Sequence, residues 1–193
     1  MPGPQTFKEM HMATERWEID PSHSGIHFSV RHLVIAKVRG QFSRWSGVLV
    51  VPDGDFTKAT VEAVIDASSI ETGVADRDAH LKSADFFDVA NFPEVAFSAS
   101  RFDAQGDGHG RLAGSLTIKG VTKDIVLDVE RHGQAKDPWG NERAAFSATV
   151  SIDRKDFGLT WNQVLETGGV MVGERVNLEI EIEAVRQAAT KAA

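Results

Sequence analysis

The chain has 193 residues, of which 41% are hydrophobic and 25% charged, and its formal net charge is −7 at pH 7. This composition is that of a folded globular protein, and the length suits a single β-barrel or sandwich domain. The negative charge argues against a nucleic-acid surface, which needs clustered Lys and Arg, and it also disfavours binding to an anionic membrane face. The absence of cysteine excludes disulfides, thiol catalysis and thiolate metal sites.

Residues 1–16 contain no uninterrupted apolar run, and Lys8, Glu9, Glu15 and Arg16 would interrupt the core of a secretory signal. We expect a flexible N-terminal segment and a cytoplasmic protein, or a periplasmic one if a signal has been removed. The sequence has no run of about 18 apolar residues, so we expect no stable membrane insertion.

Alternating apolar and polar residues dominate the rest of the chain. Successive side chains of a strand point to opposite faces, so this period of two predicts strands with one buried face. The predicted strands are 26–30, 48–51, 61–65, 95–99, 112–118, 125–129, 146–152 and 178–182. Clusters rich in turn-forming residues separate them, at 52–55, 105–108, 137–141 and 168–169. The short spacing predicts an up-and-down antiparallel arrangement, with a hairpin after Ile118.

About eight such strands close into a barrel that is either filled with side chains or holds one small ligand. Small residues at inner-facing positions favour a hollow barrel: Ala63, Ala99, Gly114 and Ala148. The alternative is that they fit the taper of a filled barrel, inside which small and large residues also alternate. The predicted fold is therefore a mainly β protein, an antiparallel β-barrel of about eight strands.

A charged segment interrupts this pattern between residues 74 and 89 and predicts a short surface helix that borders the opening of the barrel. Asp76 and His80 are four residues apart and would share a helix face, so a general base held by a carboxylate is one interpretation. No nucleophile can be placed beside it. The favoured alternative is that Arg77, Asp78 and His80 tie the helix to neighbouring strands. A third interpretation places them at the polar end of a ligand.

Histidines near the start of the chain suggest a metal site only weakly. His23 and His27 could face the same side of a strand, whereas His32 has the opposite parity. A zinc site needs three or four ligands, so a structural or surface role is favoured. Ser22 and Ser24 beside His23 do not form a nucleophile and base pair, because neighbours on a strand point to opposite faces. We predict neither a catalytic nor a metal site.

A series of short motifs, in order along the chain, resembles the YceI-like family. The motifs are Trp17-Glu18-Ile19-Asp20, His23-Ser24, Phe28-Ser29-Val30-Arg31-His32, Val38-Arg39-Gly40-Gln41-Phe42, Ala67-Ser68-Ser69-Ile70-Glu71-Thr72, Arg77-Asp78-Ala79-His80-Leu81, Phe86-Phe87-Asp88, Phe92-Pro93, Leu116-Thr117-Ile118-Lys119-Gly120-Val121-Thr122-Lys123, Trp139-Gly140 and Arg154-Lys155-Asp156-Phe157-Gly158-Leu159. Each motif alone is modest, but their common order makes a chance match implausible. The resemblance covers roughly Trp17 to Val185.

The resemblance implies an extended lipocalin-like antiparallel β-barrel with a short helix near one end, which binds a polyisoprenoid or similar long apolar chain in its lumen. Family members are often periplasmic and frequently dimeric, and no catalysis is established for them. We therefore expect a barrel domain over residues 17–186, a disordered tail over 187–193 and a homodimer. The expected partner is a long-chain apolar lipid, such as a polyisoprenoid or isoprenoid quinone, and no further cofactor is required.

Two groups of side chains are predicted to contact this ligand. The lumen residues are Phe28, Val30, Phe42, Ile65, Phe86, Phe97, Leu116, Ile118, Leu127, Phe146, Val150, Phe157 and Met171. The polar-end residues are Arg39, Arg77, Asp78, His80, Trp161 and Asn162. Each lumen residue has the competing interpretation of plain core, and Arg39 and Asp78 could instead form a surface ion pair.

Three functions from different classes follow from these features. The leading hypothesis is noncatalytic binding, carriage or storage of an isoprenoid lipid or quinone. The second is an enzyme acting on such a lipid through His80, Asp76 or Asp78. The third is a structural or stress-response dimer whose barrel is filled and whose exposed strands mediate assembly.

Overall fold

Antiparallel strand pairing organises the computed structural model, which describes residues 14–33, 35–166 and 169–188. Within these residues eleven strands form one sheet, in the order β1-β4-β5-β7-β8-β9-β10-β11-β2-β3-β6. Their bounds are β1 Thr14–Ile19, β2 Gly25–His32, β3 Ala36–Phe42, β4 Trp45–Pro52, β5 Thr60–Asp66, β6 Ile70–Glu71, β7 Glu94–Gly106, β8 His109–Ile118, β9 Val121–Lys136, β10 Glu142–Asp153 and β11 Val172–Arg186.

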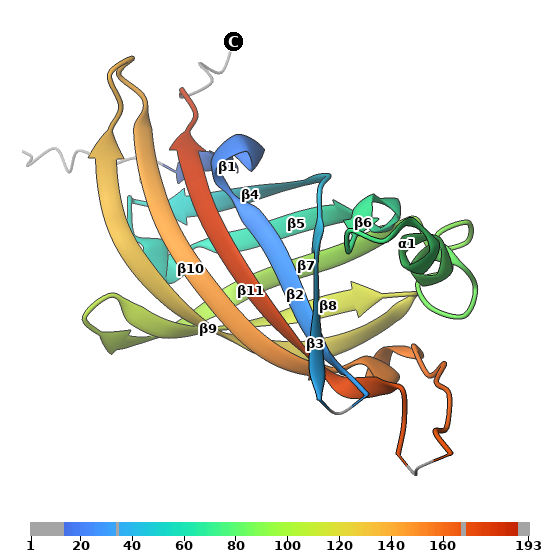
Figure 1. The fold of residues 1–193 in the computed structure, drawn as a ribbon. Helices are drawn as coiled ribbons and strands as arrows, with labels where there is room; N and C mark the ends of the chain where they lie inside the picture. Colours follow the sequence, from blue (N-terminus) through green and yellow to red (C-terminus); the bar gives the residue numbers. More distant parts are fainter. Residues whose placement is uncertain (1–13, 34, 167–168, 189–193) are drawn as a thin grey trace, which may run out of the picture.

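Pairing between β1 and β11 closes eight of these strands into a barrel (Figure 1). The end of β11, around Ala184, pairs with β1, whereas its earlier part pairs with β2. Strands β2, β3 and β6 then continue the sheet beyond the closure. The predicted lipocalin-like barrel of about eight strands is therefore confirmed.

Each of the eight strands predicted from alternation lies within an observed strand. The sequence analysis did not predict β1, β3 or β6. Strand β6 has only two residues, which is too short for any periodicity to show. Gly40 lies within β3, where a Cβ atom would lie 2.3 Å from the Phe28 ring and 2.7 Å from the Glu71 carbonyl oxygen, so the close approach of β2 requires glycine.

Left-handed backbone at the β8–β9 turn confirms the predicted hairpin. Ile118 pairs with Val121, and the two residues between them, Lys119 and Gly120, both have positive φ angles, 49° and 74°. Two consecutive positive φ angles are the signature of a type I′ turn, whose twist matches that of the flanking strands.

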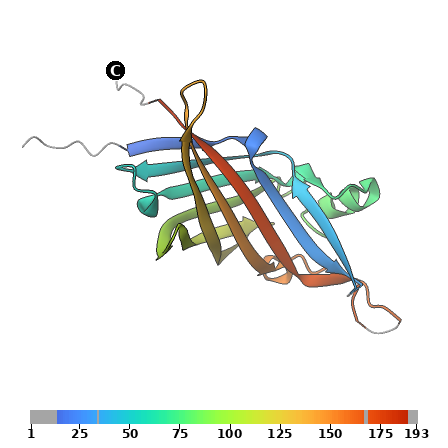
Figure 2. The same cartoon turned by 60° about the vertical axis from the view of Figure 1, so that its left-hand side comes forward.

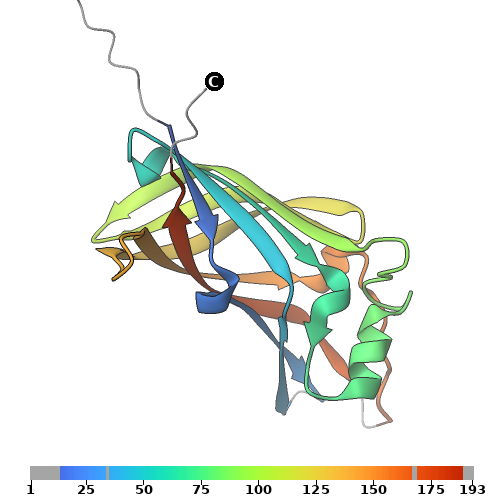
Figure 3. The same cartoon turned by 90° about the horizontal axis from the view of Figure 1, so that it is seen from above.

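The charged insert forms helix α1 (Ala75–Lys82), which is shorter than the predicted segment. Phe86 and Phe87 lie in the turns that follow the helix. In Figure 3 the helix lies at one end of the barrel, and β1 begins and β11 ends towards the opposite end. Among the described residues no helix has the length and apolar character needed to cross a membrane.

Four 3-10 turns join the strands: η1 (Pro21–His23), η2 (Phe56–Lys58), η3 (Ala67–Ser69) and η4 (Arg154–Phe157). An aspartate precedes each one and accepts a hydrogen bond from the backbone N–H two residues later, as Asp153 does from Lys155. This arrangement satisfies a backbone donor that the turn itself leaves free.

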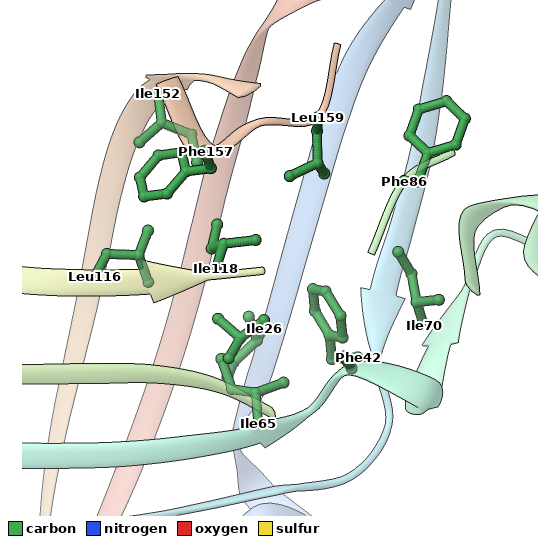
Figure 4. Packing of buried hydrophobic residues seen from close by; sticks show 12 residues of the cluster. Ile26, Phe42, Ile65, Ile70, Phe86, Leu116, Ile118, Ile152, Phe157 and Leu159 are labelled. Carbon is green, nitrogen blue, oxygen red and sulfur yellow. The ribbon is translucent and has the colours of Figure 1, made fainter. Parts of the chain in front are cut away.

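Buried apolar residues form two clusters inside the barrel. The larger one surrounds Phe157 near the α1 end and includes Ile70, Phe86 and Leu116 (Figure 4). The smaller one surrounds Trp17, which has no exposed surface. Residues of both clusters line the cavity described next.

Candidate ligand-binding cavity

A cavity of about 440 Å³ runs inside the barrel. Side chains from all eight closing strands and from β2 reach its wall, and nearly all of them are apolar. The exceptions among the described residues are Thr57, His109, Arg131 and Arg154. A cavity of this volume with so few polar groups is typical of a site for an apolar ligand.

The two ends of the cavity differ in exposure. Near α1 the wall consists of buried or partly buried side chains, such as Phe157, Leu159 and Leu81. At the opposite end the wall includes the exposed residues Gly108, His109 and Arg131, at and beside the β7–β8 turn. The cavity is therefore closed beneath α1 and open at the β7–β8 turn.

This geometry corrects the expectation that the helical insert borders the opening. Helix α1 and the turns after it cover the closed end, where Leu81 and Phe86 reach the wall. The β8–β9 turn adds to this cover, since the Lys119 ammonium donates to the carbonyl of Ala84 at 2.8 Å. The period-two pattern identified the inner face of each strand, but it carries no information about which end of a barrel an insert closes.

Most of the predicted lumen residues lie on the cavity wall. These are Phe28, Val30, Phe42, Ile65, Phe86, Phe97, Leu116, Ile118, Leu127, Phe146 and Phe157. Val150 is not on the wall; it packs against the larger buried cluster, so inward parity alone did not expose it to the lumen. Met171 is not on the wall either, because it precedes β11 in a connection whose backbone pairs with Leu33 and Gln163.

The small residues that favoured a hollow barrel divide into two pairs. Ala63 and Ala148 lie on the cavity wall. Ala99 and Gly114 instead make room for neighbours, since a Cβ atom at Gly114 would lie 2.7 Å from the Ala99 Cβ and 2.8 Å from the Phe97 ring. The cavity therefore results only in part from small residues.

None of the six predicted polar-end residues lies on the cavity wall. Arg77 and Asp78 both bind Thr72, the residue after β6. Asp78 accepts from the Thr72 N–H at 2.8 Å, and Arg77 donates to the Thr72 carbonyl at 2.9 Å. Arg39 is exposed on β3. These contacts attach α1 to the loop that precedes it, and not to a neighbouring strand as the structural interpretation of the helix expected.

His80 and Trp161 meet each other at the closed end. Their rings are nearly perpendicular, with centroids 4.6 Å apart, and Phe86 packs against both. His80 also contacts the Asp85 carboxylate at 2.9 Å, so its partner is not the Asp76 that the helical spacing suggested. Asn162 bridges to β11 through both backbone groups of Val172. These side chains close the barrel without reaching its lumen.

Arg154 is a buried cation on the wall that the sequence analysis missed. Its guanidinium donates to the carbonyls of Gly173, Leu159, Trp161 and Val172. Burial lowers the pKa of this guanidinium from its ordinary value. The sequence carried no signal for this burial, because Arg154 follows a strand within a polar turn, where arginine is ordinarily solvated. Its hydrogen bonds fasten the connection before β11 over the closed end.

Three polar side chains lie at the open end of the cavity. Arg131 lies over the Phe56 ring at 4.9 Å and donates to Gln134 at 2.6 Å. His109 and Thr57 complete the group. This end therefore offers hydrogen-bonding groups close to solvent, and the apolar wall begins behind them.

A charged cluster outside the cavity includes His23. Oxygen or nitrogen atoms of Asp20, His23 and Glu183 lie within 4.8 Å of one another. Arg143 donates to Asp20 at 3.0 Å and also to Glu183 and Asp137. The guanidinium of Arg143 bridges these three carboxylates, so the cluster is an ion-pair network. His27 is not part of it.

Hydrogen bonds depress two acidic pKa values in this network. The Ser22 hydroxyl, His23 and Arg143 hold the pKa of Asp20 well below its usual range, and Asn141 and Arg143 do the same for Asp137. The same carboxylates raise the pKa of Arg143. The network joins the β1–β2 corner to the β9–β10 hairpin.

Comparison with known proteins gives a family match over most of the chain. The model of the YceI-like domain family matches residues 17–184. A UPF0312 protein of Staphylococcus aureus is 36% identical over 165 residues, which cover 85% of this chain and 94% of that protein.

Solved structures share the fold. The YCEI protein of Campylobacter jejuni is 33% identical with a TM-score of 0.70, covering 82% of this chain and 90% of that one. A polyisoprenoid binding domain from Saccharophagus degradans, implicated in plant cell wall breakdown, is 16% identical with a TM-score of 0.63 and covers 91% of this chain and 99% of that one. At that identity the likeness concerns the fold alone.

Proposed function

The chain belongs to the YceI-like family, and on that premise we propose that it binds a long-chain apolar lipid, such as a polyisoprenoid or isoprenoid quinone, in the lumen of its barrel. The observation that carries the proposal is the cavity, which is enclosed by the barrel, closed beneath α1 and lined almost wholly by apolar side chains. The polyisoprenoid-binding domain of Saccharophagus degradans, which has the same fold, supports the same class of ligand.

The energetics of such a site favour a hydrocarbon chain. Burial of each methylene group contributes about 0.8 kcal/mol before ordering costs, and it requires no polar partner. Arg154, the charged group at the closed end, already donates to four backbone carbonyls. We infer that the hydrocarbon tail lies towards α1 and that a polar head lies near Thr57, His109 and Arg131.

The wall chemistry favours binding over catalysis. Within the described part of the chain, the wall includes no carboxylate and only one hydroxyl side chain, that of Thr57. A general base needs a substrate proton within hydrogen-bond reach, and His80, Asp76 and Asp78, the residues of the enzymatic alternative, lie outside the wall. The cavity also argues against the filled barrel of the third alternative. The homodimer and the cytoplasmic location remain predictions.

Copurification tests the proposal directly. The protein is purified gently from its host, extracted with organic solvent, and the extract is analysed by mass spectrometry. We expect a prenyl chain or prenyl quinone in stoichiometric amount. Absence of lipid, combined with failure of the folded protein to take up added prenyl quinone, would contradict the proposal and favour the structural alternative.

A further inference from the structure

Exposed apolar side chains gather where two hairpin-like segments meet. Ile35 in the β2–β3 hairpin is 84% exposed and Val164 in the connection before β11 is 81% exposed, and Leu33 and Val170 are partly exposed. We call these four residues the apolar tip. Leu33 donates its N–H to the carbonyl of Met171 at 2.9 Å, which joins the two segments. Figures 1 and 2 show both segments projecting from the α1 end of the barrel.

Basic residues lie on the β2–β3 side of this tip in a chain that is otherwise acidic, whereas the connection before β11 carries the exposed Glu166. Residues 21–52 contain no Asp or Glu, although the chain has 28 of them. Arg31 and Lys37 face each other across the β2–β3 pair, and Arg39 follows on β3. All three are exposed, and none forms an ion pair with a carboxylate of the described residues. We call these three the basic collar.

We propose that the apolar tip and basic collar dock the protein onto the surface of an anionic lipid bilayer. Apolar side chains on a narrow projection can enter the boundary between headgroups and acyl chains, while basic residues next to them contact anionic headgroups. Arginine and lysine suit this position because their apolar stems lie along the boundary and their charges stay in water. The net charge of −7 disfavours an anionic surface for the chain as a whole, but screening limits the interaction to the charges nearest the bilayer, which on the β2–β3 hairpin are basic.

A second copy of the chain fits this surface less well. A two-fold symmetric contact would place the same patch of both copies face to face, and therefore one basic collar against the other. Like charges brought together in this way oppose association. The projecting shape of the tip also suits a soft bilayer better than a flat protein partner.

Docking at this end leaves the open end of the cavity directed away from the bilayer. Val30 and Val172 line the cavity at the tip end of β2 and β11, where Val172 pairs with His32, whereas His109 and Arg131 lie at and beside the β7–β8 turn. Docking and cargo binding therefore use separate residues. A variant that loses vesicle docking but keeps its cargo, or the reverse, therefore distinguishes a failure of this proposal from a failure of the proposed function.

Vesicle cosedimentation tests the proposal. Wild-type protein is mixed with vesicles of phosphatidylcholine alone or of phosphatidylcholine and phosphatidylglycerol in equal parts. We expect binding to the anionic vesicles that weakens as salt is added. The tip variant combines Ile35→Asn with Val164→Asn, and the collar variant combines Arg31→Gln with Lys37→Gln. Removal of each basic residue is expected to weaken binding roughly fivefold, and the tip variant should lose about tenfold or more.

The matched control combines Val64→Asn with Val126→Asn, two exposed valines on other strands, and should bind like the wild type. Circular dichroism verifies that all variants are folded, and lipid extraction verifies that their cargo is unchanged. Equal binding to neutral and anionic vesicles, no binding by the wild type, or unchanged binding by the tip and collar variants would overturn the proposal. So would a wild-type dimer that the tip variant converts to a monomer, since the tip would then be a contact between copies.

Discussion

His80 packs edge-on against Trp161, with ring centroids 4.6 Å apart and an angle of 87° between the ring planes. One residue belongs to α1 and the other to the connection between η4 and β11, so this contact joins two segments that are far apart in the sequence. Phe86 completes the group. The contact explains how a short helix with no fully buried residue remains attached to the closed end of the barrel.

We predict that His80→Ala lowers the free energy of unfolding by about 1–2 kcal/mol, because each aromatic pair contributes about 0.5–1.5 kcal/mol. His80→Phe, which keeps a ring, should lose less. Asp85→Asn serves as the control, since it removes only the partly exposed ion pair and should cost under about 1 kcal/mol. Urea unfolding measures all three. If Asp85→Asn costs more than His80→Ala, the ion pair rather than ring packing holds the helix.

A bulky side chain in the lumen should block lipid uptake without unfolding the barrel. Ala63 lies on the cavity wall, whereas its neighbour Val64 is 41% exposed. We therefore expect Ala63→Trp to reduce uptake of an added prenyl quinone at least tenfold, and Val64→Trp to leave it unchanged. Quinone extraction after gel filtration measures uptake. Equal uptake by both variants would place the cargo outside the lumen.

Arg154 should be one of the most sensitive positions for stability. Arg154→Met removes the donors of four hydrogen bonds and leaves buried carbonyls unsatisfied, for an expected loss of about 3 kcal/mol or more. Arg154→Lys should restore part of this loss. Lys155→Met, at an exposed neighbour that pairs with Glu174, should cost under about 1 kcal/mol. Denaturant unfolding distinguishes these values, and a mild effect of Arg154→Met would show that water replaces the guanidinium.

The Arg143 network predicts how stability depends on acid. The folded-state pKa values of Asp20 and Asp137 lie below their unfolded value of about 3.9. The stability that they contribute is therefore fully present above pH 4 and is lost as the pH falls through the lower folded-state values. We expect the thermal midpoint of the wild type to fall below pH 4.

Arg143→Met should lower the thermal midpoint by a few degrees at pH 7 and should flatten its decrease in acid, because both carboxyl pKa values then move towards the ordinary range. Arg101→Met is the matched control, since Arg101 and Asp103 form an exposed pair at 3.4 Å. Scanning calorimetry at several pH values provides the measurement. An unchanged acid slope in Arg143→Met would contradict a role for this arginine in lowering the two pKa values.

The sequence predicted eight of the eleven strands in the described residues, most of them from alternation between a buried and an exposed face. In β11, for example, Leu178, Ile180 and Ile182 alternate with glutamates, and all three line the cavity. Strand β3 was not predicted, although Val38, Gly40 and Phe42 are less exposed than the polar residues between them, as in a strand with one buried face. One of its residues, Phe42, lies on the cavity wall. The central inward position is a glycine, which has no side chain to mark the buried face.

The contacts of the polar residues were not predictable from the alternation of apolar and polar residues. His80 and Asp85 meet only because the chain turns back after α1, and Arg154 meets four carbonyls only because the connection before β11 folds over it. Such contacts join residues of irregular segments, whose directions no periodicity encodes.

By itself the sequence determined the family, through its ordered motifs. It also determined the antiparallel barrel and eleven residues of its apolar wall, because alternation along a strand is a local property of the backbone. Only the tertiary structure decided that the cavity is closed beneath α1, that Arg154 is buried there, and that Arg131 and His109 lie at the open end. The physical reason is that odd or even position along a strand fixes which face of the sheet a side chain lies on. Which end of the barrel is closed depends instead on how distant segments pack after the strands have paired.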